Sequence, residues 1–311
     1  MDEEHLNKAV QQIKEIKMTS EERARMLENI LGSKIKTKHG IRSPYFLSLL
    51  VSLCCLVVII SSATVVYARG SLPGSTLYSL KVNVLEPARG AFIFSPVKKI
   101  QYESDLATER IVEAEILAGR DDLDEQKVDR LNALLEKHTK TFNAATVSFR
   151  EDASHDEDSN DDIVTNFQAQ MNAHARLLEV ISEREDKKNE QHQKISKTAR
   201  DNAIKVRSSI ATKKDTIPER YKKRKDTVTS LIDSTDTDLG QTDTTVSPKK
   251  KRIVEDTHKT LDEARKFLKE GDDDDKAGNF NNAYGKLLDS ESSAKEADIF
   301  FKAGIKLESA R

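Results

Sequence analysis

Apolar residues recur at helical spacing along most of this chain, whereas one stretch, from Tyr45 to Ala68, is free of charge throughout. A helix of about 20 apolar residues crosses the hydrocarbon core of a bilayer. Tyr45 and Tyr67 lie near the two ends, where aromatic residues meet the membrane interfaces. We therefore expect a transmembrane helix over residues 44–69.

The flanking charges predict how this helix is oriented. Basic residues precede it at Lys34, Lys36, Lys38 and Arg42, whereas only Arg69 and Lys81 follow closely. Cytoplasmic flanks carry the excess of Lys and Arg. We expect a single-pass protein of the plasma (inner) membrane, with a cytoplasmic N-terminus and the C-terminal part outside. The alternative is a signal peptide cleaved after Ala68, but the long apolar stretch and the residues before it favour an uncleaved anchor.

Residues 1–43 are expected to form a cytoplasmic helical segment of two short helices. Leu6, Val10 and Ile13 begin the apolar stripe of the first. Thr19 and Glu22 have the spacing of a capping box, which predicts the start of the second. Thirty residues cannot close a core alone, so this segment either contacts a partner or the membrane surface, or is a short tail before the anchor.

Beyond the apolar stretch, residues 97–232 are expected to form an extracytoplasmic antiparallel bundle of long helices. Ser95-Pro96 is a typical helix start and Gly119 a typical stop. Two further helices carry apolar seams with coiled-coil spacing. These seams are Val128, Leu131, Leu135, His138, Phe142, Ala145 and Phe149, and Ile163, Phe167, Met171, His174, Leu178 and Ile181.

If the two seams pair as an antiparallel hairpin, His138 and His174 fall in one layer, with Tyr102, Glu103 or Leu106 nearby. Two histidines in one layer indicate a metal or pH-sensing site, or a polar layer that sets the register. Because no third ligand is certain, both are weak metal candidates, and we favour the polar layer. No cofactor is expected.

The C-terminal third divides into a linker and a hairpin. Residues 233–247 are polar and of low complexity, which predicts a mobile linker. Residues 248–311 contain two apolar stripes, separated by Gly271 and the acidic run after it. We expect a C-terminal helical hairpin whose first helix ends at Gly271. The fold class is thus all-α throughout.

Composition excludes several classes of function. The chain has 51 basic and 53 acidic residues among its 311, so no overall positive field favours nucleic acid. The basic stretch Tyr221–Lys225 is expected to be a solvated helix face. The only cysteines, Cys54 and Cys55, lie inside the apolar stretch, which excludes a disulfide framework and a cysteine zinc site. No nucleotide-binding, nucleophile-elbow or zinc-protease motif is present, so we expect no enzyme and no small-molecule substrate.

The segment between the apolar stretch and the bundle, residues 70–96, is expected to form a juxtamembrane collar. Pro73-Gly74 predicts a turn, and Leu77, Tyr78 and nearby apolar residues can dock a short helix on the bundle. Charged side chains are expected to form ion pairs between this segment and the first long helix. These are Lys81, Glu86 and Arg89 on the collar, and Glu109 and Arg110 on the helix.

The same residues resemble a bacterial family of single-pass membrane proteins known as a domain of unknown function. Its pattern after the span is P-G-x-x-L-Y-x-x-K, followed by E-x-x-R and F-x-P, then E-R-x-x-E-A-x-x-L. Here it is carried by Pro73, Gly74, Leu77, Tyr78, Lys81, Glu86, Arg89, Phe94, Pro96, Glu109, Arg110, Glu113, Ala114 and Leu117. The chain departs from it at Ser79-Leu80 and Pro87. The resemblance implies an architecture and a location, and no activity.

We therefore expect a membrane-anchored, non-enzymatic interaction or scaffold protein of the envelope that binds protein partners through its helical seams. The alternative is a transmembrane signalling regulator of the anti-sigma type, in which the outer bundle senses and residues 1–31 hold a cytoplasmic factor.

Overall fold

The computed structural model describes residues 19–31, 70–151, 157–182, 189–208, 217–242 and 247–309, and every regular element in these ranges is a helix. The expected all-α fold is therefore confirmed for them. The predicted span 44–69 and the helix expected before Thr19 lie outside the described residues. Among the helices that are described, none has the length and hydropathy needed to cross a bilayer. The chain divides into two compact units, Met1–Ser62 and Ala63–Arg311.

In the first unit the described helix is α2 (Ser20–Leu31). The predicted capping box is present. The Thr19 amide donates to Glu22 Oε2 at 3.0 Å, and the Glu22 amide donates to Thr19 Oγ1 at 3.3 Å. These bonds satisfy amide groups that the first turn of a helix leaves without partners.

The second unit begins with the collar, where one continuous helix is built from three segments. These are α4 (Tyr78–Leu80), the π-helical η1 (Lys81–Leu85) and α5 (Glu86–Ala91). Pro87 explains the wide turn, because in an α-helix its ring would clash with the carbonyl of Asn83. The π turn, in which the Glu86 amide donates to Lys81 O, lets the helix continue through Pro87. We call residues 78–91 the collar helix.

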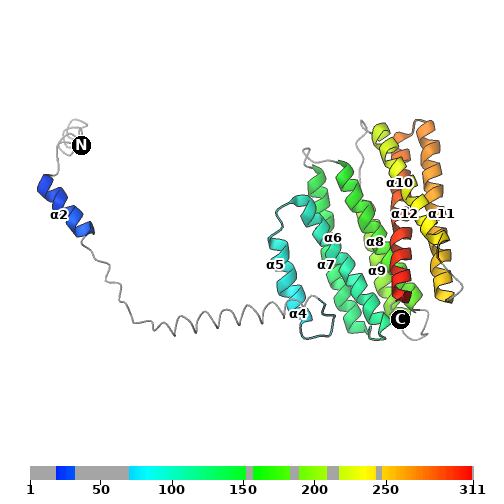
Figure 1. Cartoon of the computed structure of the whole chain (residues 1–311), viewed down its shortest axis with the longest axis horizontal. Coiled ribbons are helices and arrows are strands. Elements are labelled where there is room, and N and C mark those ends of the chain that lie inside the picture. The colour runs from blue at the N-terminus through cyan, green and yellow to red at the C-terminus, as the bar shows by residue number, and fades with distance from the viewer. Residues whose placement is uncertain are drawn as a thin grey trace, which may run out of the picture. The chain divides into compact units, whose positions relative to one another are not determined.

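Four helices enclose the first core (Figure 1): α6 (Pro96–Gly119), α7 (Glu125–Glu151), α8 (Glu157–Ser182) and α9 (Asn189–Arg207). The helix α6 packs against α7 and α8, and so does α9 from the other side. The helices α7 and α8 therefore lie diagonally, and the predicted hairpin of neighbouring seams is wrong. The apolar stripes of α6 and α9 also require burial, and each of these two helices packs against both α7 and α8.

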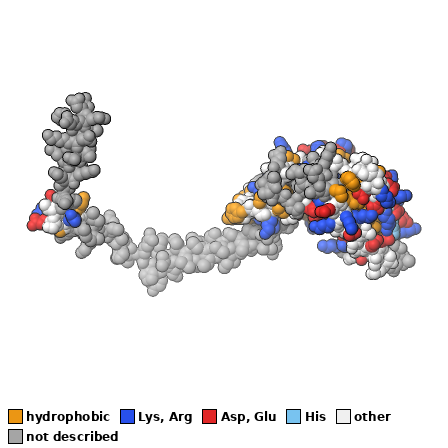
Figure 2. Space-filling view, turned by 90° about the horizontal axis from the view of Figure 1, so that it is seen from above, with side chains coloured by type: hydrophobic (Ala, Val, Ile, Leu, Met, Phe, Trp, Pro, Cys, Tyr) orange, Lys and Arg blue, Asp and Glu red, His pale blue; other side chains and the backbone are white. Residues whose placement is uncertain are grey.

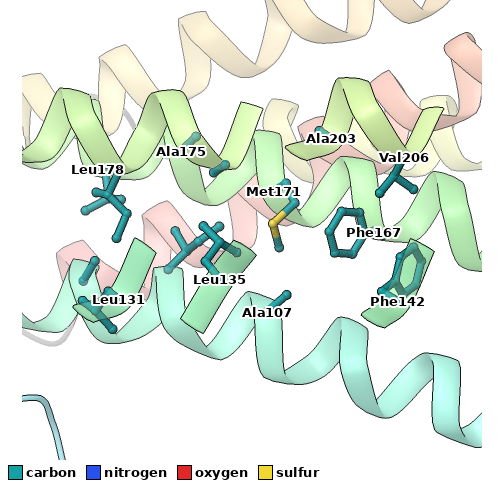
Figure 3. Packing of buried hydrophobic residues seen from close by; sticks show 14 of the residues in the cluster. Ala107, Leu131, Leu135, Phe142, Phe167, Met171, Ala175, Leu178, Ala203 and Val206 are labelled. Carbon is teal, nitrogen blue, oxygen red and sulfur yellow. The ribbon is translucent and has the colours of Figure 1, made fainter. Parts of the chain in front are cut away.

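Residues of both seams nevertheless meet in the centre of this core. The rings of Phe142 and Phe167 stack with their centroids 4.4 Å apart, and Figure 3 shows them on the same side of Met171. All three side chains are fully buried. The seams expected to bind partners are thus enclosed by the chain's own helices.

A second core lies on the other face of α8. It is formed with α10 (Ile217–Gly240), α11 (Pro248–Lys276) and α12 (Phe280–Ser309). From α8, Ala173 and Leu177 point into this core, whereas Phe167 and Met171 belong to the first. The helices α11 and α12 pack along each other as a hairpin, and α12 also packs on α8. Because α8 is buried on two faces, it joins the two cores.

The predicted mobile linker 233–247 is wrong over residues 233–240, which are the last turns of α10. Leu239 is buried in the second core together with Ile232. Thr235 is also buried, and its hydroxyl donates to Leu231 O at 2.9 Å. The polar composition concealed this helix, because its threonine hydroxyls bond to the helix's own carbonyls. Residues 243–246 lie outside the described ranges.

The prediction that the first helix of this hairpin ends at Gly271 is wrong, because α11 continues to Lys276. A Cβ at Gly271 would lie 3.0 Å from Tyr221 Oη and 3.1 Å from Ala283 O. The glycine therefore permits close packing against α10 and α12. The turn to α12 comes at Gly278, whose φ of +77° favours glycine.

Candidate functional site

The collar helix is fastened to α6 by buried charged and polar side chains. We call Tyr78, Lys81, Glu86, Glu109, Arg110 and Glu113 the collar network. Arg110 is fully buried at its centre. Its Nη1 donates to Tyr78 Oη at 2.8 Å, and its Nη2 donates to Glu86 Oε1 at 2.5 Å. One guanidinium thus holds the collar helix at two points, Tyr78 at its start and Glu86 about two turns further on.

Glu113 completes the network from the next turn of α6. It accepts a hydrogen bond from Tyr78 Oη at 2.7 Å, and its other oxygen lies 2.5 Å from Lys81 Nζ. Lys81 also lies 2.7 Å from Glu109. The expected ion pairs from Lys81 and Glu86 to α6 are therefore present.

The network contains three carboxylates and two cations, which affects its titration. Burial raises the pKa of Glu113, and neighbouring Arg110 and Lys81 oppose that shift without cancelling it. Both cations are shared with other carboxylates, Glu86 and Glu109. Burial also raises the pKa of Tyr78, so its hydroxyl keeps its proton.

The remaining motif residues shape the ends of the collar. Pro73 is buried, and Gly74 has a φ of +95° in a turn where an added Cβ would lie 3.0 Å from Lys127 Cε. Leu77 precedes α4 as its N-cap residue. Arg89 does not join the collar network, contrary to expectation, and its guanidinium lies 5.5 Å from the ring centre of Tyr102.

Tyr102 belongs to the same contact surface, although the motif analysis did not include it. Its hydroxyl donates to Glu86 O at 2.8 Å. Burial, with the nearby Glu86 carboxylate, raises the pKa of Tyr102 to about 12. A tyrosine within the first two turns of α6, facing the collar, is the sequence signal that could have indicated it.

His138 and His174 do not share a layer. Each pairs through Nδ1 with a different glutamate of α6: His138 with Glu103, and His174 with Glu115, both at 2.8 Å. Those glutamates are about 18 Å apart along the helix axis. The expectation that Glu103 lies near His138 is confirmed, but the layer of two histidines is wrong. In the residues that the structure describes, no three His, Cys, Asp or Glu side chains are grouped to hold a metal.

Two adjoining cavities lie between the collar helix and the bundle. The polar cavity, of about 340 Å³, is lined by Val82, Glu86, Pro87, Gly90, Ala91, Lys99, Tyr102, Glu103, Leu106, Lys137, His138 and Thr141. The apolar cavity, of about 530 Å³, is lined by Gly90, Ala91, Ile93, Phe94, Pro96, Lys99, Ile100, Ala145, Ser148 and Phe149. Gly90, Ala91 and Lys99 line both. Neither cavity is predicted by the pattern of the sequence.

Two aromatic side chains stand in solvent beside the apolar cavity. Phe92 is 78% exposed and Phe94 is 88% exposed. They lie in the short connection between the collar helix and α6, where the chain turns. Exposed large apolar groups beside a cavity are typical of binding surfaces.

A second network, partly buried and not predicted from the sequence, joins α8, α10 and α12. We call it the C-terminal network, and its members are Asp158, Asp161, Asp162, Arg220, Arg224, Tyr284, Glu291 and Lys295. Arg224 Nε lies 2.5 Å from Glu291 Oε2, and Lys295 Nζ lies 2.7 Å from Glu291 Oε1. The basic stretch Tyr221–Lys225 is therefore not a wholly solvated face, because Tyr221 and Arg224 are buried.

The spacing of the charged residues could have indicated this second network. Arg220 and Arg224 are four residues apart and share one face of α10. Asp158, Asp161 and Asp162 lie likewise within one turn at the start of α8. Elsewhere, on the face seen in Figure 2, acidic and basic side chains are interspersed over the described surface.

Comparison with curated proteins and with solved structures finds no match. A family model described as Domain of unknown function (DUF5667) matches residues 70–297, from the collar into α12. The matched region contains the whole collar network, both cavities and the C-terminal network. Because it covers most of the chain, the protein belongs to the DUF5667 family.

Proposed function

We propose that this protein is a single-pass membrane protein whose helical unit lies outside the cytoplasm and binds an envelope component at its collar, without catalysing a reaction. The uncharged stretch from Tyr45 to Ala68 supports the anchor, and the basic residues before it support the orientation. The collar begins directly after this stretch.

The exposure of Phe92 and Phe94 beside the apolar cavity carries the proposal of an interaction surface. The helical seams are enclosed in the cores, which leaves the collar as the better candidate for contact. The collar network fixes the helix that precedes these aromatics. A surface held rigid in this way loses little conformational entropy on binding.

Topology is tested with single cysteines in a full-length chain in which Cys54 and Cys55 are replaced by serine. Ser20→Cys and Ser309→Cys place one exposed thiol in each unit. We expect a membrane-impermeant maleimide to label Ser309→Cys in intact cells, and Ser20→Cys only after lysis. Labelling of Ser20→Cys alone in intact cells, or recovery of the chain in the soluble fraction, would overturn the proposal.

Contact at the collar is tested by placing a photoreactive phenylalanine analogue at position 94 of the full-length chain. Phe280, an exposed aromatic residue of α12, is the matched control position. We expect adducts with an envelope component from position 94 and far fewer from position 280. Equal yields from the two positions would contradict a specific surface at the collar.

A signalling regulator of the anti-sigma type is the second candidate, and the α2 helix favours it. This helix is capped by its own side chains in a separate unit, and Met26 is 55% exposed on it. The test is copurification of a sigma factor with the full-length chain. Recovery that Met26→Asp abolishes supports this role, and no recovery with the unaltered chain opposes it.

A further inference from the structure

The outer face of the collar helix is apolar, whereas its charged residues Lys81 and Glu86 are buried against α6. A stripe of four apolar residues, spaced by four, four and three positions, runs along this outer face: Leu80, Val84, Ala88 and Ala91. Val84 is 52% exposed, and the two alanines are exposed as well. A helix on a water-facing surface has the reverse arrangement, with its apolar stripe buried and its charges in solvent.

Exposed aromatic residues follow this stripe at the end of the helix. Phe92 and Phe94 come directly after Ala91, and we call the stripe together with these two rings the collar surface. Residues 70–97, all of which the structure describes, contain three charged residues, and of these only Arg89 is exposed. In a chain of which 33% of the residues are charged, so large an uncharged exposed surface is typical of a binding face.

The length of chain before the collar indicates what this surface contacts. The uncharged stretch ends at Ala68, and Ser71 is already buried in the second unit. Three residues span at most about 10 Å when fully extended. Because the stretch is proposed to cross the bilayer, the start of the collar lies within that distance of the bilayer surface. A lipid surface is therefore the partner closest to these residues.

The form of the collar surface also fits a lipid surface. Residues 78–91 extend for about 20 Å as a helix, and a helix with one apolar face lies in the membrane interface with that face buried. Lys99 is exposed and lines the apolar cavity together with Ala91 and Phe94. Basic side chains beside an apolar face are attracted to anionic lipid headgroups.

We propose that the collar surface lies in the headgroup region of the bilayer, with Phe92 and Phe94 inserted among the acyl chains. The collar network holds the charged side of the helix on α6, which keeps the apolar side toward the lipid. This inference rests on the proposed function and deepens it, since it names the lipid surface as the envelope component that the collar contacts.

The test is the quenching of a single tryptophan by brominated acyl chains, in the full-length chain reconstituted into phosphatidylcholine vesicles. The chain contains no tryptophan, so each substitution supplies the only indole. Phe94→Trp is compared with Phe280→Trp, which replaces an exposed phenylalanine of α12. Val84→Trp is compared with Ile204→Trp, which replaces an exposed aliphatic residue of α9.

We expect brominated lipid to quench the two collar variants several-fold more than their controls, because bromine quenches only an indole that contacts the acyl chains. Equal quenching within the pairs would overturn the proposal. Collar indoles that are shielded from water, shown by blue-shifted emission, but are not quenched by bromine would show that a protein or a second copy covers the surface. That result would also overturn the lipid contact.

A further pair of variants tests whether these residues act as one surface. In the chain with Val84→Trp, the added substitution Phe92→Asp should lower the quenching several-fold, because a carboxylate resists transfer from water to an apolar environment. Phe280→Asp is the control and should leave the quenching unchanged. Melting temperatures in detergent should be unaltered, since both positions are exposed. Quenching that survives Phe92→Asp would refute a common surface.

The inference and the proposed function fail separately. If the chain floats with the vesicles and Ser309→Cys is labelled in intact cells, but the collar is not preferentially quenched, the topology stands and the lipid contact is refuted. If the quenching is found but the labelling fails, the contact stands and the placement outside the cytoplasm is refuted. A chain that does not float with the vesicles refutes the anchor and the contact together.

Discussion

The collar network and the C-terminal network both bury an arginine, a tyrosine and a glutamate, and both hold one more carboxylate than cations, but they differ in the partners and the pKa shifts of their buried glutamates. The two oxygens of Glu291 face Arg224 and Lys295, and the two oxygens of Glu113 likewise face Arg110 and Lys81. In the collar network Lys81 and Arg110 are shared among three carboxylates, and one oxygen of Glu86 has no partner.

The pKa values of Glu113 and Glu291 shift in opposite directions. Burial raises the pKa of Glu113, whereas Lys295 and Arg224 overcome burial and lower the pKa of Glu291. The C-terminal network is not uniform in this respect, because burial raises the pKa of Asp161 and of Asp162. The collar network, with its unpaired Glu86 oxygen, lies beside the two cavities. The comparison therefore distinguishes the two networks by the pKa shift of the glutamate at the centre of each.

The largest expected effect is that of Arg110→Met. The substitution leaves Glu86 and Glu113 buried without their central cation, and breaking a buried pair in this way costs about 3–5 kcal/mol. Urea unfolding of the full-length chain measures the loss. Arg130→Met is the control, because the exposed Arg130 lies over the Tyr78 ring, 4.9 Å from its centre, from the solvent side. If Arg110→Met lowered the free energy of unfolding by as little as that control does, the collar network would contribute little to stability.

The second comparison is Tyr78→Phe against Tyr284→Phe. Each tyrosine hydroxyl joins an arginine to a carboxylate, Arg110 to Glu113 and Arg220 to Asp161. Removing either hydroxyl should cost about 1–3 kcal/mol, because buried partners lose a hydrogen bond. Only Tyr78→Phe should speed proteolysis within residues 70–96, which limited trypsin digestion measures. Faster cleavage of that segment in Tyr284→Phe would argue against two separate networks.

The third comparison uses pH. The folded-state pKa of Glu113 is raised above its ordinary value of 4.5, so its contribution to stability is present below that value and is lost as the pH rises through the folded pKa. The pKa of Glu291 is lowered, so its contribution is present above 4.5 and is lost as the pH falls through the folded pKa.

The cost of Glu113→Gln should therefore shrink as the pH rises from 4.5, and the cost of Glu291→Gln should shrink as the pH falls from 4.5. Unfolding free energies of both variants and the wild type between pH 3 and pH 8 provide the measurement. Parallel profiles for the two variants would contradict the opposite pKa shifts assigned to Glu113 and Glu291.

The smallest expected effect is that of Phe92→Ser combined with Phe94→Ser. Both rings are exposed, so the free energy of unfolding should change by no more than about 0.5 kcal/mol. Thermal or urea unfolding checks this. A much larger loss would show that the aromatic pair stabilises the fold and is not a free binding surface.

The sequence predicted the helices with clear apolar stripes, because the spacing of buried residues reports a helix face directly. The motif residues Tyr78, Lys81, Glu86 and Arg110 were also identified, and the structure brings these four together. These residues combine charged and aromatic side chains at helical spacing, and the next helix carries charged residues at the same spacing. Such a pattern can be recognised within a short segment of the sequence.

Neighbour relations between helices could not be predicted in the same way. Pairing the seams of α7 and α8 ignored the stripes of α6 and α9, which also need partners, and so it misplaced His138 relative to His174. The polar end of α10 was taken for a linker, since Leu239 alone gives little periodicity. The cavities depend on where several helices meet, and no single segment encodes that.

Hydrogen exchange of the amides in the collar helix, measured in the full-length chain, tests the central claim most directly. If buried Arg110 and its partners hold this helix on α6, amides of residues 82–91 should be protected nearly as well as those of α6, and Arg110→Met should remove that protection while α12 stays protected. Rapid exchange of these amides in the wild type, or protection that survives Arg110→Met, would contradict the account.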